Sequence, residues 1–233
     1  MLRHLLFSGG NDIKVYIIQL LLSLPIILLA LSLHETAHGF VAYKLGDPTA
    51  RNLGRLTLNP IKHLDPIGFL CMLLAGFGWA NPVPINSRNF RKPRRDIALT
   101  SVAGPVSNLL LAFVFVVIYR FTIPKWLGSI YIVSLGGGAP IDKIYFYLYI
   151  FIYLAIQMNI TLAVFNLLPI PPLDGSKILY SFLPPNVYFK IAPYERYISL
   201  AFMLLLLTGV ISPLLSTVSG YIMDGMFFVV GIK

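Results

Sequence analysis

The sequence HETAH occupies residues 34–38 and lies inside an apolar stretch that is long enough to cross a bilayer. An ionised carboxylate such as Glu35 costs roughly 2.5–3.5 kcal/mol at membrane depth, so its presence there indicates a functional site. Residues four apart lie on one face of a helix, so His34 and His38 can offer two imidazoles to one metal ion, with Glu35 beside them. A catalytic zinc needs three protein ligands and an open position for water, so the pattern predicts a third ligand elsewhere in the chain.

The composition is typical of membrane proteins with several spans. Of the 233 residues, 57% are hydrophobic and only 12% are charged, and the mean hydropathy is +0.79. These values lie outside the range of ordinary soluble domains. No small-residue cleavage site precedes the first apolar stretch, which favours a permanent span over a removed signal peptide. The single cysteine, Cys71, excludes an internal disulfide and a cysteine-rich zinc site.

The positive charge is explained by membrane topology. The formal net charge is +9, and half of the 18 lysines and arginines lie between Lys44 and Arg95. The positive-inside rule assigns that segment to the cytoplasm. Because no nucleic-acid recognition fold accompanies the charge, nucleic acid is not an expected partner.

We expect an all-α polytopic membrane protein with about five transmembrane helices. The first helix should begin after Asn11-Asp12 and end at residues 45–48 (LGDP), where a glycine and a proline stop it. At about 1.5 Å per residue, His38 then lies roughly 10 Å inside the cytoplasmic end of that helix. The other spans are predicted over about residues 97–119, 144–168, 198–211 and 213–232. The sequence therefore predicts a multi-pass protein of the cell membrane with its active site facing the cytoplasm.

Two short segments separate the first and second spans. Residues 66–80 are apolar but short and contain three glycines, which is typical of a re-entrant or interfacial segment. Residues 81–86 (NPVPIN) are extended by their prolines, and an edge strand or strand-like loop is expected there. We expect one integral-membrane domain over residues 1–233, with a catalytic core over about 13–183 and extra helices over about 195–232.

Asp174 is the candidate for the third metal ligand. Three prolines between residues 169 and 172 end the third span and leave irregular backbone at membrane depth. Such backbone is tolerated only where it is buried in protein or lines a wet cavity. The cytoplasmic ends of the first and third spans lie on the same side of the membrane, so Asp174 can complete a site with two histidines and one carboxylate. An alternative is that Asp174 only caps the short helix that begins near Gly175.

These motifs together resemble the site-2 protease family of intramembrane zinc metalloproteases. HETAH fits the HExxH motif of the family, Asn166 followed by Asp174-Gly175 fits its LDG region, and residues 103–108 (AGPVSN) fit a small-residue motif between them. The resemblance covers about residues 13–183 and points to the compact type without PDZ or CBS domains. It implies that His34, His38 and Asp174 bind one zinc ion per chain. It also implies that Glu35 acts on water and that Asn166 holds substrate or the oxyanion.

The remaining candidate residues concern the substrate, and each has a structural alternative. A helical substrate must unwind before cleavage, and the extended segment could pair with it by strand addition. The residues assigned to substrate binding are Asn81, Pro82, Val83, Pro84 and Asn108. Asn108 also fits a small-residue helix-packing face, and Asn166 could instead satisfy carbonyls that Pro169 exposes. His63 is left open between a turn residue and a supporting group near the metal.

The sequence thus predicts a zinc endopeptidase that cuts transmembrane segments of other proteins near the cytoplasmic side. In that reading, a bound zinc polarises the peptide carbonyl and lowers the pKa of its water to about 7. Glu35 takes the proton of the water and passes it to the leaving amine. The two competing hypotheses are a transporter, in which His34, Glu35 and Asp174 form a metal or proton path, and a non-catalytic assembly factor that retains the motif. The simplest alternatives for the motif itself are two packed histidines, or a Glu35 that pairs with a loop arginine.

Overall fold

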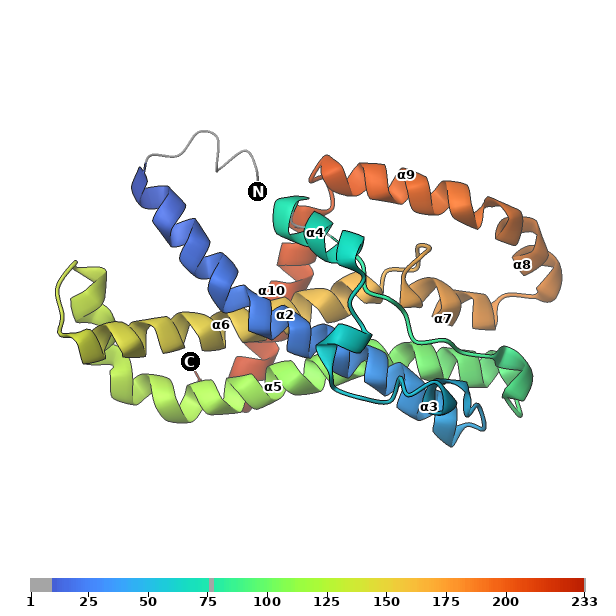
Figure 1. Cartoon of the computed structure of the whole chain (residues 1–233), viewed down its shortest axis with the longest axis horizontal. Coiled ribbons are helices and arrows are strands. Elements are labelled where there is room, and N and C mark those ends of the chain that lie inside the picture. Colours follow the sequence, from blue (N-terminus) through green and yellow to red (C-terminus); the bar gives the residue numbers. More distant parts are fainter. Residues whose placement is uncertain (1–9, 76–77, 233) are drawn as a thin grey trace. The chain divides into compact units, whose positions relative to one another are not determined.

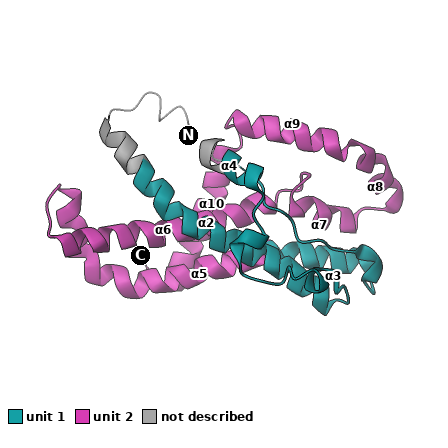
Figure 2. Ribbon diagram, in the orientation of Figure 1, with its two compact units in different colours: residues 1–104 teal, residues 105–233 magenta. Residues whose placement is uncertain are grey.

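The computed structural model describes residues 10–75 and 78–232, and these residues form helices joined by short loops (Figure 1). The described residues contain no strand, and the predicted all-α fold is confirmed. The chain divides into two compact units, residues 1–104 and 105–233 (Figure 2). The boundary falls inside helix α5 (Pro93–Ser134), whose first twelve residues therefore belong to the first unit.

The first unit is built on the long helix α2 (Gly10–Lys44), which carries the HETAH motif in its last third. The helix ends where the sequence predicts, because Gly46 adopts a φ of +111°, a left-handed conformation that favours glycine. Short helices follow: α3 (Thr49–Asn52), the 3₁₀ turn η1 (Pro60–Lys62), α4 (Pro66–Ala75) and the 3₁₀ turn η2 (Ser87–Asn89). With 10 residues, α4 extends over only about 15 Å, too short to cross a bilayer.

The segment after α4 is extended but forms no named strand. One isolated antiparallel bridge joins Leu64 and Ala80, and residues 81–86 continue without regular structure. Of the two alternatives that the sequence left open, the strand-like loop is the one observed. Pro82 and Pro84 explain this outcome, since neither has an amide hydrogen to donate to a ladder.

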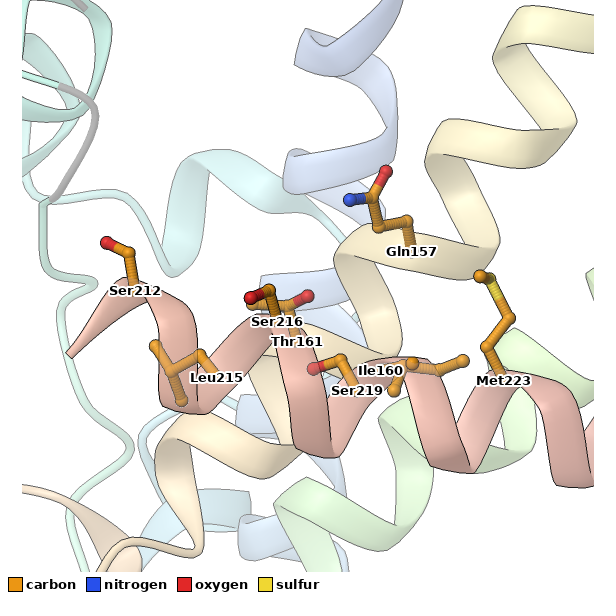
Figure 3. Close-up of a pocket in the computed structure, with 9 residues that line it drawn as sticks. Gln157, Ile160, Thr161, Ser212, Leu215, Ser216, Ser219 and Met223 are labelled. Atoms are coloured by element: carbon orange, nitrogen blue, oxygen red, sulfur yellow. The ribbon is translucent and has the colours of Figure 1, made fainter.

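The second unit contains the rest of α5 together with α6 (Pro140–Asn166) and α10 (Ser212–Val229), which pack around an aliphatic core. The buried core residues are Ala112, Val116, Ile123, Ile152, Ile156, Ile160 and Val164. The connecting elements are α7 (Asp174–Phe182), α8 (Pro185–Ile191), the 3₁₀ turn η3 (Ala192–Tyr194) and α9 (Glu195–Leu207). A cavity of about 250 Å³ lies between α6 and α10, and Ser212, Ser216 and Ser219 follow one another along its α10 side (Figure 3).

Three of the described helices are long and apolar enough to span a membrane: α2, α5 and α6. A fourth candidate arises if residues 185–207 and α10, which are bent by 84° at their junction, count as one broken span. The predicted number of about five is therefore not confirmed. The predicted span over residues 198–211 corresponds to α9, whose 13 residues extend about 20 Å, well short of the hydrocarbon thickness.

Candidate metal centre and its supporting loops

Two imidazoles converge on the buried face of α2. The side chains of His34 and His38 are 4% and 6% exposed, and their Nε2 atoms lie 3.0 Å apart. The Nδ1 of His38 donates a hydrogen bond of 2.7 Å to the carbonyl oxygen of Thr100. Because a carbonyl oxygen can only accept, this bond places the ring proton on Nδ1, so the Nε2 that faces His34 is the unprotonated nitrogen of His38. A hydrogen bond of this kind is the usual support of a metal-binding histidine.

Gly104 leaves the space that an ion needs beside these nitrogens. A Cβ placed on Gly104 would lie 2.4 Å from Nε2 of His38 and 2.6 Å from Nε2 of His34. No larger residue fits without displacing the rings, so α5 approaches the two histidines closely only because residue 104 is glycine. Two imidazole nitrogens about 3 Å apart suit a tetrahedral zinc with bonds of about 2.0–2.1 Å.

Glu35 is half-buried, and its carboxylate is held by the extended segment. The backbone amide of Val83 donates a hydrogen bond of 2.7 Å to Oε2 of Glu35. Within residues 10–75 and 78–232, no arginine forms an ion pair with Glu35, so the alternative of a loop-arginine partner is not observed. Val83 is itself buried, and its side chain fits against Gly39 of α2. The sequence singled out Val83 for substrate binding and gave no sign of this contact with Glu35.

Asp47 fastens the far end of the same segment to the end of α2. It is fully buried, and its carboxylate accepts hydrogen bonds of 2.7 Å from the backbone amide of Asn86 and from the side-chain amide of Asn89. Burial alone would raise the pKa of Asp47, but the hydrogen bonds from Thr49, Asn89 and Asn86 outweigh it and hold the pKa below its usual value. Asp47 is therefore ionised at neutral pH and ties two loops together.

His63, whose role the sequence left open, is a buried loop residue. Its side chain is 1% exposed, and Nε2 donates a hydrogen bond of 2.7 Å to the carbonyl oxygen of Thr57. The hydroxyl of Thr36, next to Glu35 on α2, donates to the same carbonyl at 2.7 Å. His63 thus helps to hold the loop over residues 54–64 against α2.

In the second unit, Asp174 is the first residue of α7 and is 7% exposed. Leu173 occupies the capping position, so Asp174 is not the cap residue that the alternative interpretation required. Lys177 donates a hydrogen bond of 3.2 Å to the Asp174 carboxylate. The following glycine is required by a close approach, because a Cβ on Gly175 would lie 2.3 Å from the carbonyl oxygens of residues 167 and 168.

The two asparagines of interest have hydrogen-bond partners within the second unit. The side-chain amide of Asn166, the last residue of α6, donates a hydrogen bond of 2.9 Å to the carbonyl oxygen of Leu162. Asn108 is fully buried, and its side-chain amide donates to Oδ1 of Asn159 at 3.1 Å. This contact joins α5 to α6, as the packing interpretation of Asn108 expects. Asn159 was not singled out from the sequence, although an asparagine in an apolar helix is an available signal.

Comparison with known proteins identifies the family. The family model described as peptidase family M50 matches residues 22–208. The chain belongs to peptidase family M50. This membership confirms the resemblance to site-2 proteases and the prediction of a membrane-embedded metalloprotease with several spans. The matched residues include the HETAH motif in the first unit and Asp174 in the second.

Three relatives of this M50 peptidase come from different organisms. YwhC of Bacillus subtilis, named as a proposed zinc metalloprotease, is 44% identical over 182 residues, which cover 78% of each chain. Rip2 of Mycolicibacterium smegmatis, named in the same way, is 31% identical over 186 residues, 78% of this chain and 64% of the relative. A third such protein, from Methanocaldococcus jannaschii, is 29% identical over 173 residues, 72% of this chain and 80% of the relative. No solved structure matches the chain significantly.

Proposed function

We propose that this M50 peptidase is an intramembrane zinc endopeptidase in which His34, His38 and Asp174 hold one zinc ion. The convergence of the two Nε2 atoms, with Gly104 leaving space beside them, carries the proposal. Asp174 is buried, begins a helix and lies in the LDG sequence that the family resemblance identifies. The zinc named for the relatives agrees with the ligand types, since imidazole and carboxylate both suit this ion.

The chemistry needs a base beside the metal and a donor for the oxyanion. Zinc, when bound, supplies a Lewis acid that activates water at neutral pH. Glu35 directly follows the proposed ligand His34 and precedes the proposed ligand His38 by three residues. The Val83 amide holds only its Oε2. The other carboxylate oxygen can take the proton of the attacking water and return it to the leaving amine. Asn166 is proposed to donate to the oxyanion, a contact whose loss typically costs about 2.7–4 kcal/mol.

The proposed substrates are transmembrane segments of other membrane proteins, cut near the cytoplasmic side. The cluster of lysines and arginines between Lys44 and Arg95 supports this orientation, because it follows the helix that carries the motif. An unwound substrate needs partners for its backbone groups, and the extended segment over residues 81–84 offers them by strand addition. Asn108 remains a proposed substrate contact only if its bond to Asn159 opens.

The test is cleavage of a helical reporter in sealed vesicles by wild type, Glu35→Gln and Glu195→Gln. Glu195 is the only other glutamate of the chain and provides the matched control. We expect Glu35→Gln to retain zinc and lose cleavage, while Glu195→Gln retains both. Full cleavage by Glu35→Gln would refute the role of Glu35. Metal flux across the vesicle membrane without proteolysis would support the transporter, and an assembly activity unaffected by Glu35→Gln would support the non-catalytic factor.

A further inference from the structure

The backbone on both sides of Val83 is tied down, and one arginine provides the N-terminal anchor. The Nη2 of Arg55 donates hydrogen bonds of 2.7 Å to the carbonyl oxygen of Asn81 and 3.3 Å to that of Pro82. On the C-terminal side, the amide of Asn86 donates to Asp47 at 2.7 Å. We propose that Arg55 is a positioning residue, which holds residues 81–86 so that the Val83 amide orients the carboxylate of Glu35. The proposal rests on the function proposed above.

The segment needs such an anchor because its own backbone provides little. Pro82 and Pro84 have no amide hydrogen, and no ladder of hydrogen bonds supports the residues between them. The amide of Asn81 donates to the carbonyl of His63 at 2.8 Å, and within the described part of the chain the segment has no other backbone hydrogen bond on that side of Val83. A charged guanidinium with two donors is well suited to hold adjacent carbonyls, and such bonds are stronger than those between neutral groups.

The loop that carries Arg55 orients its guanidinium toward the carbonyls of Asn81 and Pro82, although this orientation buries one donor without a partner. The backbone amide of Arg55 donates to the carbonyl of Ala50 at 2.9 Å, and Gly54 before it adopts a φ of +63°. The Nε of Arg55 is buried, and among the described residues it has no hydrogen-bond partner. A buried donor without a partner is unfavourable, so the fold maintains this orientation against a desolvation penalty. In this orientation the guanidinium forms its hydrogen bonds to the carbonyls of Asn81 and Pro82.

The two carboxylate oxygens of Glu35 therefore differ in their hydrogen bonding. Oε2 accepts from the Val83 amide at 2.7 Å, and Oε1 has no partner among the residues that the structure describes. The Val83 amide therefore fixes the orientation of the carboxylate through Oε2 alone. Arg55 acts on this group only through the segment, so its loss should misorient Glu35 without removing a metal ligand.

The same contacts restrict where a substrate can pair. The carbonyls of Asn81 and Pro82 already accept from Arg55, and the amide of Val83 already donates to Glu35. Four backbone groups of the segment have no hydrogen-bond partner among the described residues: the carbonyl of Val83, the carbonyl of Pro84, and the amide and carbonyl of Ile85. Strand addition is thereby limited to the stretch from Val83 to Ile85, narrower than residues 81–84 and shifted toward the C-terminus.

The experiment compares Arg55→Met, Arg55→Lys and Arg88→Met with wild type in lipid vesicles. Arg88 is exposed on η2, and its side chain forms no hydrogen bond or ion pair with the residues that the structure describes. Arg88→Met therefore removes the same charge without removing the anchor. We expect Arg55→Met to retain zinc and to lower kcat about 10- to 100-fold, the range typical of groups that orient a metal site. Arg55→Lys should restore part of kcat, because a lysine keeps one charged donor. Unchanged kcat in Arg55→Met would overturn the proposal.

A second pair of measurements separates positioning from general destabilisation. Val83→Pro removes the amide that contacts Glu35, so it should lower kcat to a similar extent, and the double variant with Arg55→Met should lose little more. If the kcat losses of the two single variants multiply in the double variant, the two residues act independently, and Arg55 does not act through Val83. Hydrogen exchange of the Val83 amide needs no catalysis, and it should become at least about tenfold faster in Arg55→Met but not in Arg88→Met. If wild type cleaves nothing, the function proposed above fails, whereas unchanged exchange would refute the anchor itself.

Discussion

Replacing Gly104 by alanine should separate metal binding from helix stability. Gly104 lies inside α5, where alanine is favoured over glycine by about 0.8–1.0 kcal/mol. On helix propensity alone the variant should be at least as stable as wild type. The new methyl group, however, would lie 2.4 Å from Nε2 of His38 and 2.6 Å from Nε2 of His34, the two atoms proposed to bind zinc.

The size of the effect follows from these distances. An ordinary contact of a Cβ begins near 3.4 Å, so relief of the overlap requires the rings or the helix to move by about 1 Å. Zinc–nitrogen bonds tolerate deviations of only about 0.2 Å. We therefore expect zinc affinity to fall at least about 10- to 100-fold, as when supporting groups of metal sites are altered.

The matched control is Gly128→Ala in the same helix. A Cβ on Gly128 meets no atom within 4 Å, so this variant gains the same helix propensity without approaching the histidines. Elemental analysis and thermal unfolding of both purified variants provide the assay. Gly104→Ala that binds one zinc per chain with wild-type affinity would refute the proposed position of the ion beside residue 104.

Three further predictions concern stability. Gly175→Ala should destabilise the protein by about 1–3 kcal/mol and lower its zinc content, because the methyl would overlap the carbonyls of residues 167–168; unchanged thermal unfolding would contradict this. Ser219→Ala should leave the free energy of unfolding unchanged or raise it by about 1 kcal/mol, since the buried hydroxyl of Ser219 has no partner among the described residues. Ser216→Ala is the control and should change the free energy of unfolding little, because the hydroxyl of Ser216 is exposed and donates to a carbonyl at 2.9 Å. Asp47→Asn should lower the free energy of unfolding by about 2 kcal/mol at pH 7 and weaken its decrease at acid pH. Because folding lowers the pKa of Asp47, its stabilising contribution is complete above the ordinary value of 3.8 and is lost as pH falls through the folded pKa. Denaturant unfolding between pH 2 and 7 would measure this difference.

The features that the sequence predicted well are those determined by neighbouring residues. The glycine and proline after Leu45 end α2 as expected, and the four-residue spacing brings His34 and His38 together. The span predicted over residues 97–119 extends in fact to Ser134, because Pro124 removes only one helical hydrogen bond and does not end α5.

The supporting contacts of the site could not be predicted because they join residues far apart in the chain. The Thr100 carbonyl that orients His38 lies 62 residues away, and the Val83 amide that holds Glu35 lies 48 residues away. Both are backbone groups, so no residue type marks them in the sequence. Arg55 was counted only as a positive charge that sets topology, since its bonds to the extended segment depend on a loop conformation that local patterns do not encode.

The central claim is that two histidines of the first unit and one aspartate of the second hold a single zinc ion. Zinc per chain in purified wild type, Asp174→Ala and Asp224→Ala tests it most directly, because Asp224 is exposed on α10 and serves as the control. We predict about one zinc in wild type and in Asp224→Ala, and much less in folded Asp174→Ala. Equal zinc in all three proteins, or none in well-folded wild type, would contradict the claim.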